Sequence, residues 1–285
     1  MRRGVTGRIG PAVRLSQRDD ELVSSTGAND VAVRVRRQGE VALSLALADL
    51  RDRYGRGRSQ LLKWLVDPYA VCGVYLAFVV LIIDRGGEAP GLAVACAVVP
   101  FQLFLTTTFN ALQLARDRSS LIENMSFPRT LLPAATTVTA TLGFAASLTL
   151  LALMMAVYAV APTPSVLWLP AVVAVTIGFA MASAYPAALF GVWFREYVPF
   201  ARSAVRVFYF LAPGVVALAQ VPGAANELVR LNPLTGIFEA YRDVLLYGHG
   251  PAAWELAYPL AFAALIAAIF VPLFRREQRE LAKVV

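Results

Sequence analysis

Long apolar stretches, separated by short polar segments, dominate the chain after residue 60. A helix that crosses a bilayer needs about 20 mostly apolar residues, because the hydrocarbon core is about 30 Å thick and each helical residue rises about 1.5 Å. The pattern therefore predicts an all-α integral membrane protein with six transmembrane helices. They are expected over Leu65–Ile83, Pro90–Leu114, Leu131–Ala161, Val166–Phe194, Pro199–Ala219 and Trp254–Phe274.

Lys and Arg gather at alternate ends of these stretches. Of the 26, 13 precede the first stretch, 3 lie between the second and third, 3 lie around the connection from fourth to fifth, and 4 lie in the tail. The other connections hold only Arg85, Arg230 and Arg242. Because cytoplasmic connections carry excess positive charge, this division predicts a multi-pass protein with both termini in the cytoplasm. The chain has 24 Arg but only 2 Lys, which is typical of proteins from GC-rich bacteria. We therefore expect the protein in the cytoplasmic membrane of such a bacterium.

The remaining sequence suggests three parts. Residues 1–38 are polar and lack periodicity, which predicts a disordered cytoplasmic tail. Residues 39–60 repeat leucines at helical spacing, which predicts an amphipathic helix on the inner membrane surface. Residues 61–285 form the six-span domain. The net charge of +7 lies beside the membrane, where topology and lipid headgroups explain it, so we expect no nucleic-acid partner.

The spans lack the groups that catalysis would need. Their central parts contain no carboxylate, His or Lys, and His249 lies in an outer connection. Cys72 and Cys96 lie inside spans, which favours packing over a metal site. No phosphate-binding Gly-x-x-x-x-Gly-Lys-Ser/Thr motif occurs, so ATP hydrolysis would need another chain. We therefore expect no catalytic residue, metal or cofactor in this chain.

The second span carries uncharged polar residues and an aromatic residue on one helical face. They follow one another in steps of four, three, one and three: Gln102, Thr106, Phe109, Asn110 and Gln113. Amides and hydroxyls can exchange hydrogen bonds with a polar substrate, so this face could line a channel. Alternatively it could join helices at a dimer contact. Five further aromatic residues are candidates for the lining: Tyr75, Phe101, Phe104, Phe208 and Tyr209.

Arg202 and Arg206 lie four residues apart near the inner end of the fifth predicted span. Guanidinium groups bind phosphate bidentately, so the pair could hold a phosphate group at the membrane surface. The alternative is that both side chains extend to phospholipid headgroups.

Three stretches resemble the membrane subunit of type-2 ABC exporters, in the branch that exports O-antigen, teichoic acid or galactan chains on lipid carriers. They are Asp49-Leu-Arg-Asp-Arg-Tyr54 with Trp64 and Pro68 following, Leu121-Ile-Glu-Asn-Met-Ser-Phe-Pro-Arg-Thr-Leu-Leu-Pro133, and Asn232-Pro-Leu-Thr-Gly-Ile-Phe-Glu-Ala-Tyr-Arg242. Trp193-Phe-Arg-Glu196 also resembles the family's Phe-Arg-Asp, with Glu in place of Asp. The resemblance covers about residues 40–285. The Gly often found ahead of the first-span Trp is absent, and the Tyr-to-Trp spacing is shifted.

This resemblance implies a homodimer that binds two copies of a P-loop ATPase subunit, which would hold ATP and Mg. It also implies a cargo: a sugar polymer could pass the polar face of the second span, and Arg202 and Arg206 could hold the pyrophosphate of a lipid-linked glycan. The interface helix would form the gate: Leu47, Leu50, Arg51, Arg53, Tyr54, Arg56 and Arg58. The connection between the second and third spans would contact the ATPase, although it could instead be an ordinary solvated loop. Its coupling residues would be Arg116, Asp117, Arg118, Leu121, Ile122, Glu123, Met125, Phe127 and Arg129. Short re-entrant helices between spans five and six would form an outer gate with Pro213, Gly214, Pro222, Gly223, Asn232, Pro233 and Arg242.

We therefore predict a permease subunit, not an enzyme, that exports a polyprenyl-pyrophosphate-linked polysaccharide, with actinobacterial cell-wall galactan as one such cargo. One alternative is a drug, lipid or peptide exporter of the same superfamily. A second is a membrane glycosyltransferase that uses a polyprenyl-phosphate donor, for which Asp84 and Glu88 are the outer carboxylates available before the fifth span. A structural assembly scaffold is a third.

Overall fold

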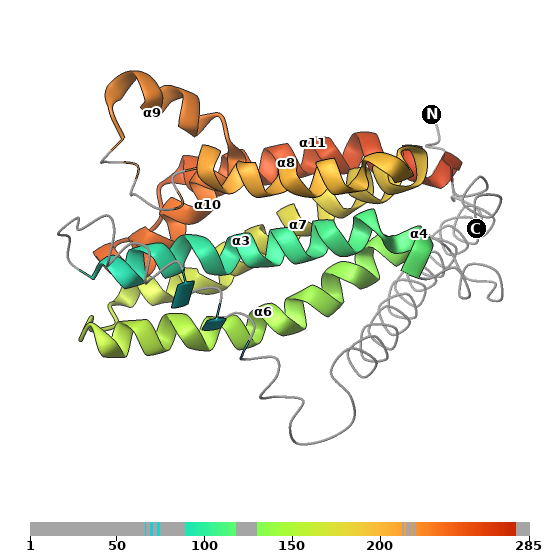
Figure 1. Ribbon diagram of the computed structural model, residues 1–285. Helices are drawn as coiled ribbons and strands as arrows, with labels where there is room; N and C mark the ends of the chain where they lie inside the picture. The colour runs from blue at the N-terminus through green and yellow to red at the C-terminus, as the bar shows by residue number, and fades with distance from the viewer. Residues whose placement is uncertain are drawn as a thin grey trace, which may run out of the picture.

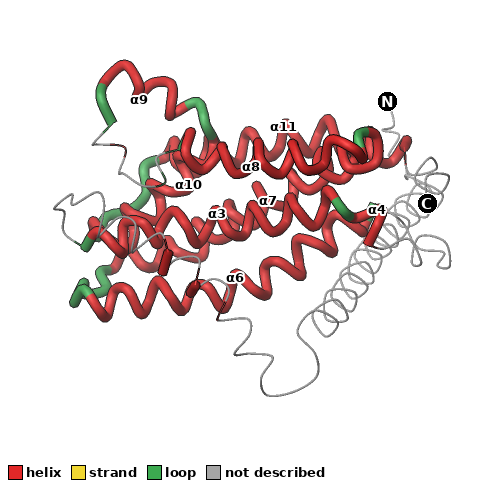
Figure 2. The backbone as a smooth tube through the Cα atoms, in the orientation of Figure 1, coloured by secondary structure: helices red, strands yellow, loops and turns green. Residues whose placement is uncertain are grey.

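The computed structural model describes residues 66, 69–70, 73–74, 89–117, 130–212, 214, 218 and 221–277. Every regular element within these residues is helical (Figures 1 and 2). Four of these helical segments are long and apolar enough to cross a membrane. They are α3 (Pro90–Leu112), α6 (Leu131–Val157), the 3-10 turn η2 (Pro164–Trp168) with α7 (Leu169–Trp193), and α11 (Ala253–Glu277).

The fifth predicted span begins as a helix that is shorter than expected. This helix, α8 (Val198–Leu211), has 14 residues, against a predicted stretch of Pro199–Ala219. At about 1.5 Å per residue it is about 21 Å long, which is less than the hydrocarbon thickness. It ends before Pro213, whose ring disfavours helical backbone in the preceding residue. The first predicted span lies almost entirely outside the described residues, so the count of six spans stays a prediction.

The long helices run side by side with alternating direction (Figure 1). Helix α7 packs against α3, α6 and α11, while α3 also packs against α6 and α8. The approach of α3 to α7 is very close at Gly191, where a Cβ atom would lie 2.0 Å from the carbonyl oxygen of Leu112. Only glycine allows the two backbones to meet at this point.

The two ends of the bundle differ in charge and in construction. One end, which we call the arginine-rich end, carries Arg116 in the four-residue helix α4 (Leu114–Asp117), Arg195 in the turn η3 (Arg195–Tyr197), and Arg275 and Arg276 in the last turn of α11. An apolar cluster with Leu112, Leu132, Leu189 and Phe274 joins the helices there. The opposite end holds α9 (Gly223–Arg230), α10 (Pro233–Arg242) and the π-helical turn η5 (Asp243–Tyr247).

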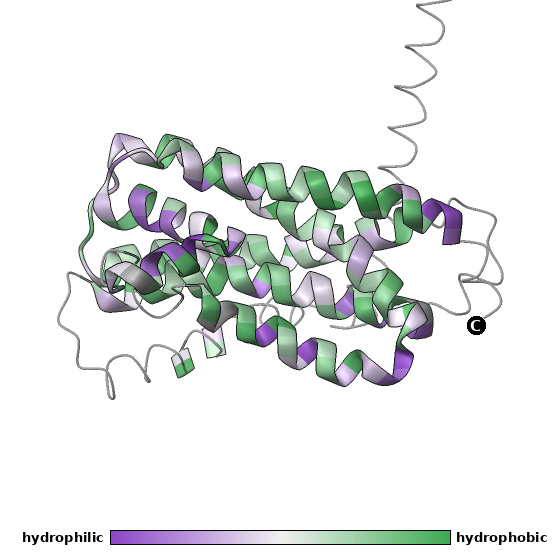
Figure 3. Cartoon of the chain, turned by 90° about the horizontal axis from the view of Figure 1, so that it is seen from above, coloured by the Kyte–Doolittle hydropathy of each residue, from purple (hydrophilic) through white to green (hydrophobic). Residues whose placement is uncertain are grey.

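Many hydroxyl groups inside α6 are satisfied locally. In α6, Thr137, Thr139 and Ser147 donate hydrogen bonds to carbonyl oxygens four residues earlier, at 3.2, 3.1 and 3.3 Å. Such bonds let a polar side chain remain in an apolar environment without an external partner. Most of the long helices are accordingly hydrophobic along their length, as the hydropathy colouring shows (Figure 3).

Candidate functional site

A single polar stripe runs along the otherwise enclosed helix α3. In the part of this helix that follows Ala93, and at its C-cap, the partly exposed residues are Gln102, Leu105, Thr106, Phe109, Asn110 and Gln113. Their steps of three and one residues place them on one face, with α6, α7 and α10 packed against other faces of the helix. All five polar or aromatic residues predicted for this face therefore share the exposed stripe. Their role in lining a channel stays a prediction.

Two of the other aromatic candidates lie in the core. Phe101 and Phe104 are buried, and the Phe104 ring lies 5.5 Å from that of Phe179 in α7. They are not on the exposed stripe, because positions 101 and 104 face the neighbouring helices. Phe208 in α8 is half exposed. Tyr75 and the side chain of Tyr209 lie outside the described part of the chain.

The arginines of α8 meet the stripe near its arginine-rich end. The guanidinium carbons of Arg202 and Arg206 lie 5.3 and 5.4 Å from the centre of the Phe109 ring. Both distances are within the range of a cation–π interaction. Arg202 is partly buried, whereas Arg206 is exposed. The two predicted phosphate-binding residues and one predicted lining residue thus form one cluster, although they are far apart in sequence.

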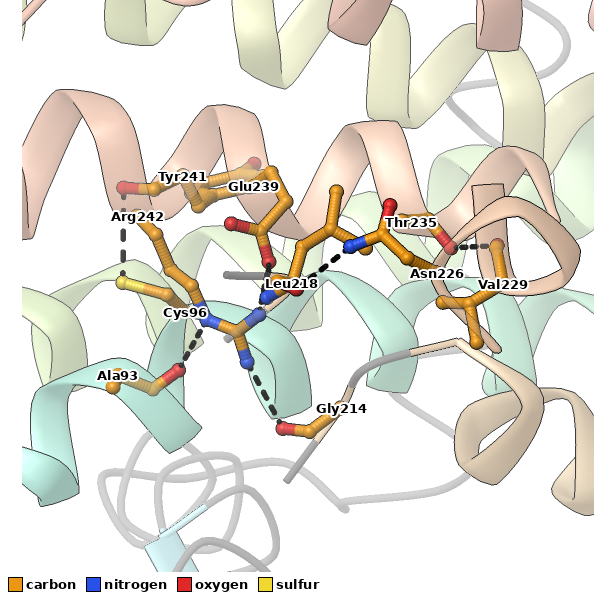
Figure 4. Close-up of polar contacts among 10 residues, drawn as sticks. All are labelled: Ala93, Cys96, Gly214, Leu218, Asn226, Val229, Thr235, Glu239, Tyr241 and Arg242. Carbon is orange, nitrogen blue, oxygen red and sulfur yellow. Dashed lines mark hydrogen bonds and ion pairs between the residues drawn. The ribbon is translucent and has the colours of Figure 1, made fainter. Parts of the chain in front are cut away.

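A buried ion pair organises the opposite end of the bundle (Figure 4). Arg242 is completely buried, and its guanidinium group is paired with the carboxylate of Glu239, one turn earlier in α10. Its Nε donates to the carbonyl oxygen of Ala93 at 3.1 Å, and a terminal nitrogen donates to that of Gly214 at 3.2 Å. Glu239 in turn accepts from the backbone N–H of Leu218 at 3.0 Å. One arginine therefore joins α10, the start of α3 and the segment after α8.

The start of α10 is fixed by a second set of polar contacts. Asn232 caps the helix by accepting from the N–H of Leu234 at 3.0 Å, and it donates to the carbonyl oxygen of Phe208 at 3.0 Å. Pro233 occupies the first helical position, where its missing N–H costs nothing. The hydroxyl of Thr235 donates to Val229 in α9. These bonds tie α8, α9 and α10 together.

Three acidic residues to which the sequence analysis gave no role in the site belong to this end of the bundle: Glu239, Asp243 and Glu255. Burial raises the pKa of Asp243, and His249, at 3.5 Å from its carboxylate, opposes that shift. The His249 side chain is exposed, and its partner is the Asp243 carboxylate. The spacing of Glu239 and Arg242, three residues apart in a helix, is a signal that could have indicated their pairing.

Several predicted residues cannot be placed. The tail, the interface helix with all seven of its residues, and Pro213 lie outside the described residues, as do Asp84 and Glu88. Of the coupling connection, only Arg116 and Asp117 are described, and both are exposed at the arginine-rich end. Of the predicted outer-gate residues, Pro222 and Gly223 are exposed at the start of α9, whereas Gly214, Asn232, Pro233 and Arg242 are buried.

Comparison with known proteins points to one class. No protein-family profile matches the chain. It is 22% identical over 243 residues to the O-antigen export system permease protein RfbA of Myxococcus xanthus, covering 85% of this chain and 94% of that relative. Two proteins of the same name from Klebsiella pneumoniae are 21% and 20% identical, over 78% and 70% of this chain and 85% and 78% of their own lengths.

These matches cover 70–85% of the chain, and they agree with the resemblance that the three sequence stretches indicated. The described helices that are long enough to cross a bilayer are those expected of a membrane permease. Over most of its length, the chain is similar to the permease subunits of ABC-type O-antigen exporters.

Proposed function

We propose that this protein is the membrane subunit of an ATP-driven exporter that moves a lipid-linked polysaccharide from the cytoplasmic to the outer face of the membrane. The observation that carries the proposal is the similarity of 243 residues to an O-antigen export permease, with 94% of that relative covered. Because the match covers 85% of this chain and 94% of the relative, it is not confined to one short segment.

The composition of the helices supports transport over chemistry. Helices α3, α6 and α7 contain no Asp, Glu, His, Lys or Arg. The charged residues of α11 lie in its first and last turns. A membrane enzyme would need an acid, base or nucleophile at its site. The energy is instead proposed to come from two copies of a separate P-loop ATPase, which binds ATP and Mg.

The polar stripe of α3 is proposed to form part of the pathway wall. In a single chain it is partly exposed, and uncharged polar groups are costly where they face lipid. A second copy of the chain would enclose the stripe, so we propose a homodimer with the pathway between the copies. Amides and hydroxyls along such a wall could exchange hydrogen bonds with successive sugars without holding any of them tightly.

The short helices α9 and α10 are proposed to close the outer end of the pathway. Their backbone is anchored by side chains rather than by a continuous helix, notably through Arg242 and Asn232. Irregular backbone at membrane depth is tolerated where protein satisfies it, which agrees with a re-entrant arrangement. The exposed Arg116 and Asp117 are proposed to lie at the cytoplasmic end, beside the ATPase.

The proposal is tested by gentle affinity purification of the full chain from native membranes, followed by mass spectrometry and reconstitution. We expect a P-loop ATPase in near-equal amount and ATP-dependent movement of a lipid-linked glycan across vesicles. Movement of small drugs or peptides but not of glycan would indicate the alternative exporter class. Sugar transfer by a preparation that lacks an ATPase would indicate the glycosyltransferase. Cell-wall galactan is the first cargo to test, since the arginine-rich composition suggests an actinobacterial source.

A further inference from the structure

Two cations share one aromatic ring at the inner end of the α3 stripe. Arg202 and Arg206 both lie against Phe109, at 5.3 and 5.4 Å from its centre. Like charges four residues apart on a helix repel each other. The ring face, which carries partial negative charge, holds both guanidinium groups near each other in spite of this repulsion. The arrangement therefore concentrates positive charge at one point of the stripe.

This charge has no described acidic partner. The ion pairs within the described residues involve Arg242 and His249, so neither α8 arginine is matched with a carboxylate there. The Nε of Arg202 is buried and finds no hydrogen-bond acceptor among the same residues. A buried charged group in a membrane protein, such as this Nε, normally has a partner or a ligand. The missing partner here would be an anion.

The surroundings of Arg202 differ from those of the arginines in α11. Arg202 is partly buried, and its Nε atom is fully buried. Arg275 and Arg276, in contrast, are exposed in the last turn of α11 at the same end.

We propose that Arg202 and Arg206, positioned by Phe109, bind the pyrophosphate headgroup of a polyprenyl-linked substrate at the entrance to the α3 stripe. The inference rests on the proposed function, since it concerns the cargo of the same pathway. Two guanidinium groups match two phosphate groups in charge and in bidentate hydrogen bonding. The polyprenyl tail could then stay in lipid while the attached sugars lie against the amides and hydroxyls of α3.

The test measures binding without ATP or the ATPase. The full-length protein in detergent is titrated with undecaprenyl pyrophosphate, and the bound lipid is counted by native mass spectrometry. Undecaprenol, which lacks the phosphates, is the neutral comparison, and inorganic pyrophosphate is added as a competitor. Arg202→Gln with Arg206→Gln removes the site. Arg275→Gln with Arg276→Gln removes the same charge from the same end of the bundle and serves as the matched control.

We expect the wild-type protein to bind undecaprenyl pyrophosphate in preference to undecaprenol, and the Arg202 and Arg206 double variant to lose about tenfold or more in affinity. The control variant should keep wild-type affinity. A double Lys variant at the same two positions should bind with intermediate affinity, since it keeps the charge but not the bidentate fork. If the Gln variant does not fold, the affinity of the double Lys variant relative to wild type still tests the site.

Unchanged binding by the Arg202 and Arg206 variant would overturn the inference, and so would an equal loss in the control, which would indicate general attraction to the arginine-rich end. Binding of inorganic pyrophosphate as tightly as of undecaprenyl pyrophosphate would indicate a site for soluble anions and would overturn the assignment to a lipid. Because no ATP is involved, failure of the site is distinguishable from failure of the proposed function. In the first case glycan export persists without arginine-dependent binding, and in the second the binding persists without export.

Discussion

The buried pair of Arg242 and Glu239 makes a strong prediction about stability. Arg242→Met keeps much of the side-chain volume but removes the charge and all the donors. The Glu239 carboxylate, which is 7% exposed, is then left in the interior with only the N–H of Leu218 as a described hydrogen-bond donor. The carbonyl oxygens of Ala93 and Gly214 lose the donors that Arg242 supplied. Helix α10, the start of α3 and the segment after α8 thereby lose the side chain that joins them.

The cost can be estimated from this geometry. Removal of one partner from a buried ion pair costs about 3–5 kcal/mol, because the remaining charge is uncompensated. For domains of 150–250 residues, each kcal/mol changes the melting temperature by about 2–4 °C. We therefore expect Arg242→Met to lower the melting temperature by about 6–20 °C. Adding Glu239→Gln to this variant should recover part of the loss, since Gln still accepts from the Leu218 N–H but carries no charge.

The assay is thermal unfolding of the full-length protein in detergent, followed by size-exclusion chromatography of the heated samples. Arg276→Met is the control, because this arginine is exposed and should change the melting temperature by only about 2 °C or less. If Arg242→Met were as stable as the control, the buried pair would not hold the structure together as argued. A double variant that is less stable than Arg242→Met would refute the claim that the unpaired carboxylate causes the loss.

Three further predictions use the same unfolding assay. Gly191→Ala should destabilise the protein strongly or prevent folding, since the added Cβ atom would meet the α3 backbone. Gly178→Ala in the same helix should be neutral, because no atom lies within 4 Å of its added Cβ. Similar effects of the two substitutions would contradict the close approach at Gly191. Asn232→Ala should cost about 0.5–2 kcal/mol through loss of the cap. Asn232→Ser should cost less, because it keeps a capping oxygen although, like Ala, it lacks the amide donor to Phe208, so equal losses would exclude capping as the cause. The pKa of Asp243 is raised on folding, so the folded state binds more protons and stability should fall as pH rises above the unfolded value of 3.8. Asp243→Asn should flatten that dependence, and an unchanged pH profile would count against the shift.

Much of the fold can be predicted from composition along the chain. Long uncharged stretches predicted helices over Pro90–Leu114 and Trp254–Phe274, and the structure has them over Pro90–Leu112 and Ala253–Glu277. This works because a bilayer requires a minimum apolar length regardless of packing details. The prediction was less accurate for the fifth stretch, where α8 ends at Leu211. Apolar composition alone does not reveal where the backbone leaves the helix.

The candidate site was predictable only in part. Helical periodicity placed the polar residues of α3 on one face, because a step of three or four residues is enough to define a face. The same reasoning could not tell that Phe101 and Phe104 are enclosed by neighbouring helices. In a helix that is apolar all round, the pattern carries little information about which side faces a neighbour.

The sequence alone thus determined the class of protein, the main apolar helices and the division of charge between the ends of the spans. Only the tertiary structure brought Arg242 to the carbonyl oxygen of Ala93, which is 149 positions away, and Phe109 to Arg202 in α8. Local propensity and hydrophobic length act within one segment, whereas ion pairs, cation–π contacts and close glycine crossings depend on how several segments pack. Those contacts form once the helices have packed into a bundle, so the sequence pattern does not reveal them.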